Sequence, residues 1–411
     1  MVKQKIGIIG GGPAGCSLAY FIHKKYPDTQ ITIYEHSQRI GGQSEIYIQD
    51  NIVHELGTCF ITGGYTCINE MLKTVSLTFS RADPGKYYTS KSNITSYVSE
   101  IDLKSFPTIM KYTAFYTMWK LFGQENNPTW KCNSMTFYDF LNKYKMPFNT
   151  KILKISTTGQ IYGPPEKITA YNAFRWFTPS LFANVFLWKV YSVDKGYQTL
   201  WEEIVKYTNS KVEFNSCVTS VKGHLGKALI TCNGKEIICD KAFVAAPLDL
   251  IENPAKAVIS EYGHIKRQNI VSLLLEFEKS NTESNLFVFD NLPHIVDIAK
   301  FPLANIKEKS KVSWVLATLD DVEFERSESE ILEMLKKELY SFRDFGKITL
   351  KRFRKYKYNL QFSPEQLINK VPQKIAAIQG KDNIYYSGGL LSHWNVESIS
   401  RFNKTLVREI K

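Results

Sequence analysis

The sequence predicts an α/β protein with two domains. A β-branched run at residues 6–9, a glycine-rich turn and a helical apolar pattern from Pro13 to Lys25 follow one another near the N-terminus. A second strand, at residues 31–34, runs directly into Glu35. Because 411 residues exceed what one compact core normally holds, a second domain is expected.

The strand, turn and helix at the N-terminus predict a dinucleotide site of the Rossmann type. Gly10 permits the sharp bend, Gly12 leaves no Cβ to block a pyrophosphate at the helix N-terminus, and Gly15 lets helix and strand pack closely. Glu35 follows Gly15 by 20 positions, where a carboxylate accepts hydrogen bonds from an adenosine ribose. Such a carboxylate would repel a ribose 2′-phosphate, so FAD and NAD are favoured over NADP.

A second glycine pair, in "EHSQRIGGQS" at 35–44, resembles the "E…RxGGR" segment of the flavin amine oxidase and phytoene desaturase superfamily. In that superfamily the pair lets the chain run past the FAD pyrophosphate, which favours FAD over NAD. Five later stretches are similar to superfamily segments in the same order: "HELGTCFI" (54–61), "VDKGYQTLWEEIV" (193–205), "VEFNSCVTSV" (212–221), "DKAFVAAP" (240–247) and "DNIYYSGGLLSHWNVESI" (382–399). The last stretch contains no cysteine, so a covalent flavin link at that position is excluded.

The resemblance implies a set of residues that contact non-covalent FAD. Gly57 and Thr58 would pass beside the flavin ring, and Val218, as the central residue of its strand, would hold the adenine through its backbone. Gly389 departs from the superfamily, which usually has an acidic residue there, so the ribitol contact must come from backbone groups or elsewhere. The full set is Gly10, Gly12, Pro13, Ala14, Gly15, Glu35, His36, Arg39, Gly41, Gly42, Gln43, Gly57, Thr58, Val218, Gly388, Gly389, Asn395 and Val396.

Both domains are expected to be discontinuous, giving an α+β protein overall. The FAD-binding domain would comprise residues 1–75, 193–265 and 370–411, and the substrate domain residues 76–192 and 266–369. Helical patterns within 105–190 predict a helical cap, and β-rich runs within 270–358 predict a mixed sheet. Ser327 and Glu330 predict a capping box at the start of an amphipathic helix.

A closer resemblance is to the bacterial polyenoic fatty acid isomerases, through "MTFYDFLNKY" (135–144), "LWKVYSVDKGYQTLWEEI" (187–204), "YKYNLQFSPEQL" (356–367) and "SHWNVESISRFNKTLVREI" (392–410). It implies an oxidoreductase or isomerase that transfers a hydride between flavin N5 and a lipophilic unsaturated substrate such as a polyunsaturated fatty acid. No catalytic side chain is identified. The alternatives are an amine oxidase or desaturase-type oxidoreductase, for which Lys266 and Tyr386 are the residues expected near the ring, and a non-catalytic flavoprotein.

Substrate contacts are predicted in the cap. The aromatic segment 171–191 either packs as ordinary core or lines an apolar channel through Phe174, Phe177 and Trp188. A fatty acid carboxylate would need a cation, for which Arg81, Lys86 and Arg175 are the candidates.

Composition and cysteine spacing indicate the cellular compartment that we expect for the protein. Without a long apolar run or a cleavable leader, we expect it to be neither exported nor membrane-spanning. Seven cysteines without a CxxC pair suit a reducing cytoplasm, and the histidines show no metal-ligand spacing, so no metal is expected. The sequence contains no second GxGxxG motif of the kind that would indicate an NAD(P)H site.

The net charge of +12 raises the question of anionic partners. No nucleic-acid module is recognisable. The densest basic stretch, "KRFRKYKY" at 351–358, is interpreted as a solvated strand surface, and a weak peripheral contact with an anionic membrane stays open. The oligomeric state is not predicted.

Overall fold

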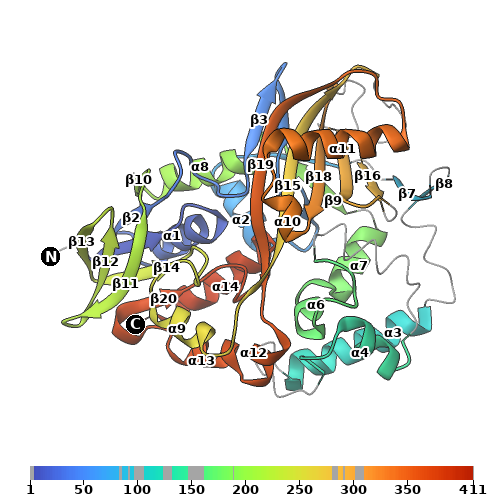
Figure 1. Ribbon diagram of the computed structural model, residues 1–411. Helices are drawn as coiled ribbons and strands as arrows, with labels where there is room; N and C mark the ends of the chain where they lie inside the picture. Colours follow the sequence, from blue (N-terminus) through green and yellow to red (C-terminus); the bar gives the residue numbers. More distant parts are fainter. Residues whose placement is uncertain are drawn as a thin grey trace.

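The computed structural model describes residues 4–82, 86–90, 93–96, 106–123, 132–146, 162–187, 189–279, 286–289, 292–300 and 310–410. A five-stranded parallel sheet lies at one end of the molecule and a seven-stranded, mostly antiparallel sheet at the other (Figure 1). Helices and smaller sheets pack around both. The predicted α/β class is confirmed.

The parallel sheet is built around β1, whose residues are almost all apolar. Ile8 on β1 pairs with Ile33 on one side and with Phe243 on the other, and all three side chains are fully buried. Continuous apolar strands of this kind are typical of a sheet covered on both faces. The strand order is β10 (Lys211–Glu213), β2 (Gln30–Tyr34), β1 (Lys5–Ile9), β14 (Lys241–Val244) and β20 (Ile384–Tyr386).

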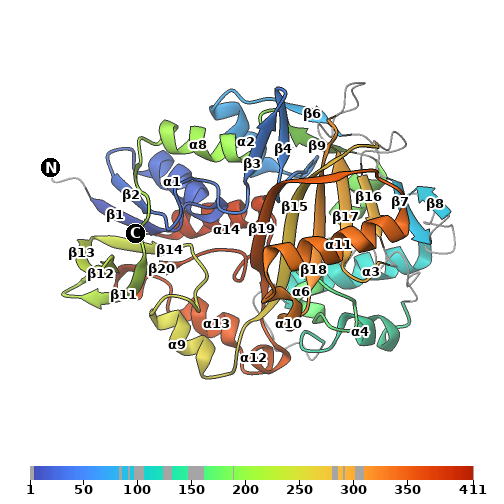
Figure 2. The ribbon, with the colours of Figure 1, turned by 45° about the horizontal axis from the view of Figure 1, so that its top comes forward.

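Helices cover one face of the parallel sheet, and a small antiparallel sheet covers the other (Figure 2). α1 (Pro13–Lys25) contacts α8 (Tyr197–Tyr207) and α14 (Val396–Glu409), and α14 contacts α2 (Thr66–Thr74). α8 starts directly after Gly196. The antiparallel sheet consists of β11 (Val218–His224), β12 (Lys227–Cys232) and β13 (Lys235–Cys239).

The stretch 212–221 forms parts of two strands, which corrects the prediction of one strand centred on Val218. β10 ends at Glu213 and belongs to the parallel sheet, whereas β11 begins at Val218 and belongs to the antiparallel one. Asn215, with a φ of +54°, lies in the turn between them, because asparagine tolerates the left-handed region.

The seven-stranded sheet has α11 (Glu328–Phe342) on one face. Ile331, Leu335 and Leu339 of this helix are fully buried against the sheet, and the predicted capping box of Ser327 and Glu330 is confirmed. The opposite face packs against the chain around Leu56 and Cys59. The order is β19 (Ile348–Gln361), β15 (Lys266–Phe277), β18 (Val312–Leu319), β17 (Ile295–Lys300), β16 (Leu286–Phe289), β7 (Lys86–Ser90) and β8 (Asn93–Ser96).

The predicted cap consists of short helices around an aromatic core. The ring centroid of Phe174 lies 4.8 Å from that of Phe140 and 5.1 Å from that of Trp119. The helices are α3 (Phe106–Met118), the π-helical turn η2 (Trp119–Gly123), α4 (Phe137–Lys143), α6 (Ala170–Trp176) and α7 (Pro179–Phe186).

Short elements make the remaining connections. These are the hairpin β3 (Ile46–Gln49) and β4 (Ile52–Glu55), the sheet of β5 (Ile61–Thr62), β9 (Val190–Val193) and β6 (Phe79–Arg81), and the helices α9 (Pro254–Ser260), α10 (Asp321–Phe324), α12 (Pro364–Ile368), α13 (Val371–Ala377) and η3 (Lys381–Asn383).

Candidate dinucleotide-binding site

The glycine-rich turn after β1 has the geometry that the sequence predicts. Gly10 has a φ of +102°, and its N–H donates to the carbonyl of Tyr34 at 2.9 Å. A Cβ added at Gly15 would lie 1.9 Å from the carbonyl oxygen of Gly10, so only glycine lets α1 start this close to the turn. At Gly12, by contrast, the only described atom within 4 Å of an added Cβ is Cα of Gly42, at 3.7 Å. Gly12 therefore borders open space at the N-terminus of α1, beside Pro13 and Ala14.

The second glycine pair lies directly against the first turn. The N–H of Gly41 donates to the carbonyl of Gly11 at 2.9 Å, and an added Cβ at Gly42 would stand 3.0 Å from Cα of Gly12. Both residues of the pair have positive φ, +111° and +54°. The two turns together form a wall without side chains, which suits the close approach of a pyrophosphate.

Glu35 is held at the end of β2 by backbone groups. Its Oε2 accepts the N–H of Gly11 at 2.6 Å, and its Oε1 accepts the N–H of Ser37 at 2.8 Å. Each oxygen keeps a second lone pair for a further donor. The backbone carbonyl of Glu35 accepts the N–H of Ser216 at 2.9 Å, which brings the start of β11 at Val218 near this carboxylate. The neighbouring His36 is exposed.

Arg39 lies beside the surface formed by Gly12 and Gly42, which we call the glycine wall, and only one of its two terminal nitrogens has hydrogen-bond partners among the described residues. Its Nη2 donates to the carbonyl of Gly42 at 2.6 Å and to Oε2 of Glu45 at 3.0 Å. Its Nη1 is buried and has no hydrogen-bond partner among the described residues. A buried unsatisfied donor is uncommon in folded proteins and is explained when a ligand supplies the acceptor.

Glu45 is a site residue that the sequence analysis missed. Besides Arg39, it accepts Nε and Nη2 of Arg354 at 2.7 and 2.6 Å, from β19 of the seven-stranded sheet. Burial alone would raise the pKa of Glu45, but the hydrogen bonds from Arg354 and the charge of Arg39 lower it below its usual value. The ion pairs fix the Arg39 guanidinium and join the loop after β2 to β19 of the seven-stranded sheet.

The segment expected beside the flavin ring packs tightly against the second glycine pair. A Cβ added at Gly57 would lie 2.2 Å from the carbonyl oxygen of Gln43, and the hydroxyl of Ser44 donates to Oγ1 of Thr58 at 3.3 Å. Just before this segment, Oε1 of Glu55 accepts the N–H of Tyr197 at 2.7 Å, and burial raises the pKa of Glu55 to about 8.

The C-terminal segment meets the same turn through Ala245. Gly388 has a φ of +116°, and the described atom nearest to a Cβ added there is the carbonyl oxygen of Ala245, at 4.0 Å. Ala245 also borders Gly10, so both glycines lie against one residue. Asn395 caps α14 by accepting the N–H of Ser398 at 2.7 Å, and Val396 is buried.

Arg175 on α6 is a buried cation beside this C-terminal segment. Its Nη1 donates to the carbonyl of Leu390 at 3.0 Å, whereas its Nη2 has no partner within the part of the chain that the structure describes. The hydroxyl of Tyr162 lies 2.9 Å from Nδ1 of His393. Burial, and secondarily the charge of Arg175, lowers the pKa of His393 well below its usual value, so this imidazole is neutral. No carboxylate pairs with Arg175 among the described residues.

The other predicted substrate residues are not gathered around Arg175. Phe174 and Phe177 are fully buried in the aromatic core of the cap, which fits the packing alternative, and a channel role stays a prediction. Arg81 is exposed at the end of β6. Trp188 and the side chain of Lys86 lie outside the described residues.

Two residues, Lys266 and Tyr386, are expected near the ring of an amine oxidase, and that role stays a prediction. Lys266 is exposed at the start of β15. Tyr386 is buried in the core between β14 and α9, close to Ala255.

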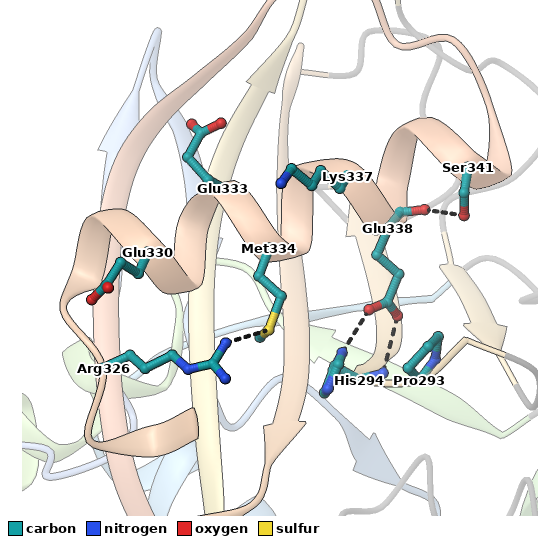
Figure 3. A pocket seen from close by; sticks show the side chains of 9 residues that line it. All are labelled: Pro293, His294, Arg326, Glu330, Glu333, Met334, Lys337, Glu338 and Ser341. Atoms are coloured by element: carbon teal, nitrogen blue, oxygen red, sulfur yellow. Dashed lines mark hydrogen bonds and ion pairs between the residues drawn. The ribbon is translucent and has the colours of Figure 1, made fainter. Parts of the chain in front are cut away.

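A pocket outside this site lies against the outer face of α11 and has a volume of about 670 Å³ (Figure 3). Glu338 accepts the backbone N–H groups of His294 and Ile295 at 3.0 and 2.8 Å, and its Oε2 lies 2.9 Å from Nδ1 of His294. These bonds attach α11 to β17. The face of the sheet that bears α11 is opposite to the one that packs on Leu56, so this pocket is separate from the glycine wall.

The comparisons agree with this geometry. Residues 8–75 match the family described as the NAD(P)-binding Rossmann-like domain. The chain is 36% identical over 76 residues to coproporphyrinogen III oxidase of Staphylococcus aureus, covering 18% of this chain and 16% of that protein. It is 23% identical over 208 residues to polyenoic fatty acid isomerase of Ptilota filicina, covering 43% and 41%. These matches therefore span less than half of either curated relative.

Solved structures resemble the chain over nearly its whole length. A CLA-producing fatty acid isomerase from P. acnes has a TM-score of 0.81 at 16% identity and covers 99% of this chain and 98% of its own. A putrescine oxidase variant has a TM-score of 0.75 at 14% identity and covers 99% and 98%. The chain thus has the fold of these solved structures, and its N-terminal residues 8–75 match a Rossmann-like, dinucleotide-binding type of domain. No helix in the described ranges is long and apolar enough to cross a membrane.

Proposed function

We propose that this protein binds FAD non-covalently and is an oxidoreductase or isomerase acting on a lipophilic unsaturated carboxylic acid, such as a polyunsaturated fatty acid. The observation that carries the substrate class is the buried guanidinium of Arg175, whose Nη2 has no partner among the described residues. FAD would be bound by residues 1–75, 193–265 and 370–411, and the substrate by 76–192 and 266–369. The likeness to two fatty acid isomerases supports this choice.

The residues present fit FAD. The wall formed by Gly12 and Gly42 leaves room for a pyrophosphate, and the unpaired Nη1 of Arg39 is a donor for it. The held carboxylate of Glu35 has lone pairs for the ribose hydroxyls. When bound, FAD supplies a hydride acceptor and donor, and the protein is left with orienting the substrate and excluding water.

Arg175 suits the recognition of a carboxylate. A buried charge is costly unless it is paired, and its neighbours here are a carbonyl, a neutral imidazole and the ring of Tyr171, 5.2 Å from Cζ. A substrate carboxylate bound at Nη2 would supply the missing charge in a charge-assisted hydrogen bond. The alkenyl chain would then be anchored beside residues 388–393, the segment that also lies against the glycine turn.

The decisive experiment incubates the flavin-loaded protein with linoleate without oxygen. An isomerase should produce conjugated-diene absorbance with no electron acceptor, whereas an oxidase or dehydrogenase should leave the flavin reduced until oxygen or another acceptor is admitted. Absence of any spectral change with unsaturated acids would overturn the proposal.

A second candidate function, amine oxidation, is favoured by two buried carboxyl groups. Oδ1 of Asp297 and Oε2 of Glu55 have no hydrogen-bond partners among the described residues. Both carboxyl groups lie near Cys59: burial raises the pKa of this thiol most, and the two carboxyl groups raise it further. An ammonium group could pair with them. However, burial raises the pKa of Asp297 well above its usual value and that of Glu55 to about 8, which disfavours the ionised carboxylates that an ammonium group needs. Flavin reduction by amines, abolished in Asp297→Asn but retained in Arg175→Gln, would establish this candidate instead.

A further inference from the structure

Helix α3 with the following turn η2 is apolar on two opposite sides. Tyr112 and Trp119 point into the aromatic core of the cap and are fully buried. On the other side, large apolar side chains face solvent: Phe106, Met110, Met118 and Leu121 are 61%, 55%, 51% and 65% exposed. At 3.6 residues per turn these four fall within an arc of about 120°. We call them, with the exposed Ala114 between them, the α3 strip.

Helix α11, which also lies at the surface, is built differently. Its outer side carries charged residues, which is the usual pattern for a helix that faces water. The exposed ones are Glu328, Glu330, Glu333 and Lys337. Residues 103–123 contain no aspartate or glutamate. The only charged residues of α3 and η2 are Lys111 and Lys120, which are exposed and border the α3 strip on its two sides.

An apolar strip bordered by lysines matches the surface of a membrane that contains anionic lipid. Helices of this composition lie in the interface, with apolar side chains in the headgroup region and lysines against lipid phosphates. The basic stretch 351–358 is a weaker candidate, because it adds no exposed apolar side chain: Phe353 is buried, and Tyr356 and Tyr358 are half-buried. Helix α3 also lies at the end of the molecule away from the parallel sheet (Figure 1).

We propose that the α3 strip docks the protein on the surface of an anionic phospholipid membrane, without crossing it. This inference does not depend on the reaction proposed above. It places the aromatic core of the cap, on the inner side of the same helix, next to the membrane.

The test is co-sedimentation of the full-length protein with vesicles. Wild type should bind vesicles of equal parts phosphatidylcholine and phosphatidylglycerol, bind pure phosphatidylcholine far less, and be released by salt. The double variant Met110→Glu/Leu121→Glu should bind the mixed vesicles at least about tenfold more weakly. The matched control Leu250→Glu/Ile368→Glu, at positions 65% and 66% exposed on other elements, should bind like wild type. Unchanged thermal melting would show that each variant is folded.

Three outcomes would overturn the proposal. These are no binding to either vesicle, equal binding to both lipids, and a loss of binding that the control variant shares. Sedimentation equilibrium without lipid tests the alternative that a second copy of the chain covers the α3 strip. A wild-type dimer that Met110→Glu/Leu121→Glu converts to a monomer would establish that alternative instead.

Discussion

The indole ring of Trp394 lies directly on Cα of Gly389, so that a Cβ added at Gly389 would stand 2.4 Å from Cδ2 of the ring. The ring cannot easily withdraw, because its Nε1 donates to the carbonyl of Leu360 at 2.8 Å and the ring of Tyr358 packs against it edge-on at 4.8 Å. Trp394 therefore occupies the space that a side chain at position 389 would need.

We therefore expect Gly389→Ala to lower the free energy of unfolding by about 1–3 kcal/mol, as in other overpacked sites. Denaturant unfolding measures this change. Gly226→Ala is not a suitable control, since its φ of +74° adds strain, whereas Ser398→Ala tests the same segment without a clash. The contact is refuted if Gly389→Ala is as stable as wild type.

The two glycines that border α1 should respond differently to substitution. Gly12→Val should keep the fold but abolish flavin retention, because a Cβ there meets no described atom closer than Cα of Gly42, and the valine would fill the space of the pyrophosphate. Gly15→Ala should instead prevent stable folding, because its Cβ would lie 1.9 Å from a carbonyl oxygen. Flavin absorbance after gel filtration and circular dichroism distinguish these effects. A yellow Gly12→Val protein would show that the turn does not hold a cofactor.

Glu35→Gln should weaken FAD binding by about 1–3 kcal/mol, since the ribose hydroxyls lose a charged acceptor. Titration of the apoprotein with FAD measures the change. Gln38→Ala, at an exposed position three residues away, should bind like wild type. Equal affinities for wild type and Glu35→Gln would remove the ribose assignment.

Stability should fall as the pH rises from about 4.3 to about 8, because of Glu55. The folded protein holds the Glu55 proton up to a pKa of about 8, whereas the unfolded chain releases it near the ordinary value of about 4.3. Between these two pH values the folded state therefore binds more protons than the unfolded state. The stabilisation that this proton provides is complete below about pH 4.3 and is lost by about pH 8. Glu55→Gln should flatten the pH dependence of the unfolding free energy there, and the exposed-site variant Glu261→Gln should not. Parallel profiles for wild type and Glu55→Gln would contradict the assignment.

The local parts of the site could be predicted from the sequence because their geometry is local. Gly10, Gly15 and Gly41 have positive φ or contacts too close for a Cβ, and each lies within a few residues of the turn it permits. The capping box of Ser327 and Glu330 is equally local, since it spans one helical turn.

The parts that were missed depend on pairing between distant segments. Glu45 and Arg354 are 309 positions apart, and no pattern near either residue indicates their ion pair. Trp394 is near Gly389 in sequence, but its ring orientation depends on Leu360 and Tyr358 of another sheet. The division of residues 212–221 between two sheets likewise follows from which strands are available as neighbours, which a single stretch does not show.

The role of Arg175 leads to the last prediction. Arg175→Gln should raise KM for linoleate about 10- to 100-fold with a smaller effect on kcat, because a charge-assisted hydrogen bond to the carboxylate is worth about 1.5–3 kcal/mol. The methyl ester of linoleate, which lacks the charge, should be affected little, and this comparison separates recognition of the carboxylate from general damage to the cap. Arg81→Gln, at an exposed position on β6, should behave like wild type. If Arg175→Gln slows the acid and the ester equally, Arg175 only positions residues 388–393 through its bond to Leu390.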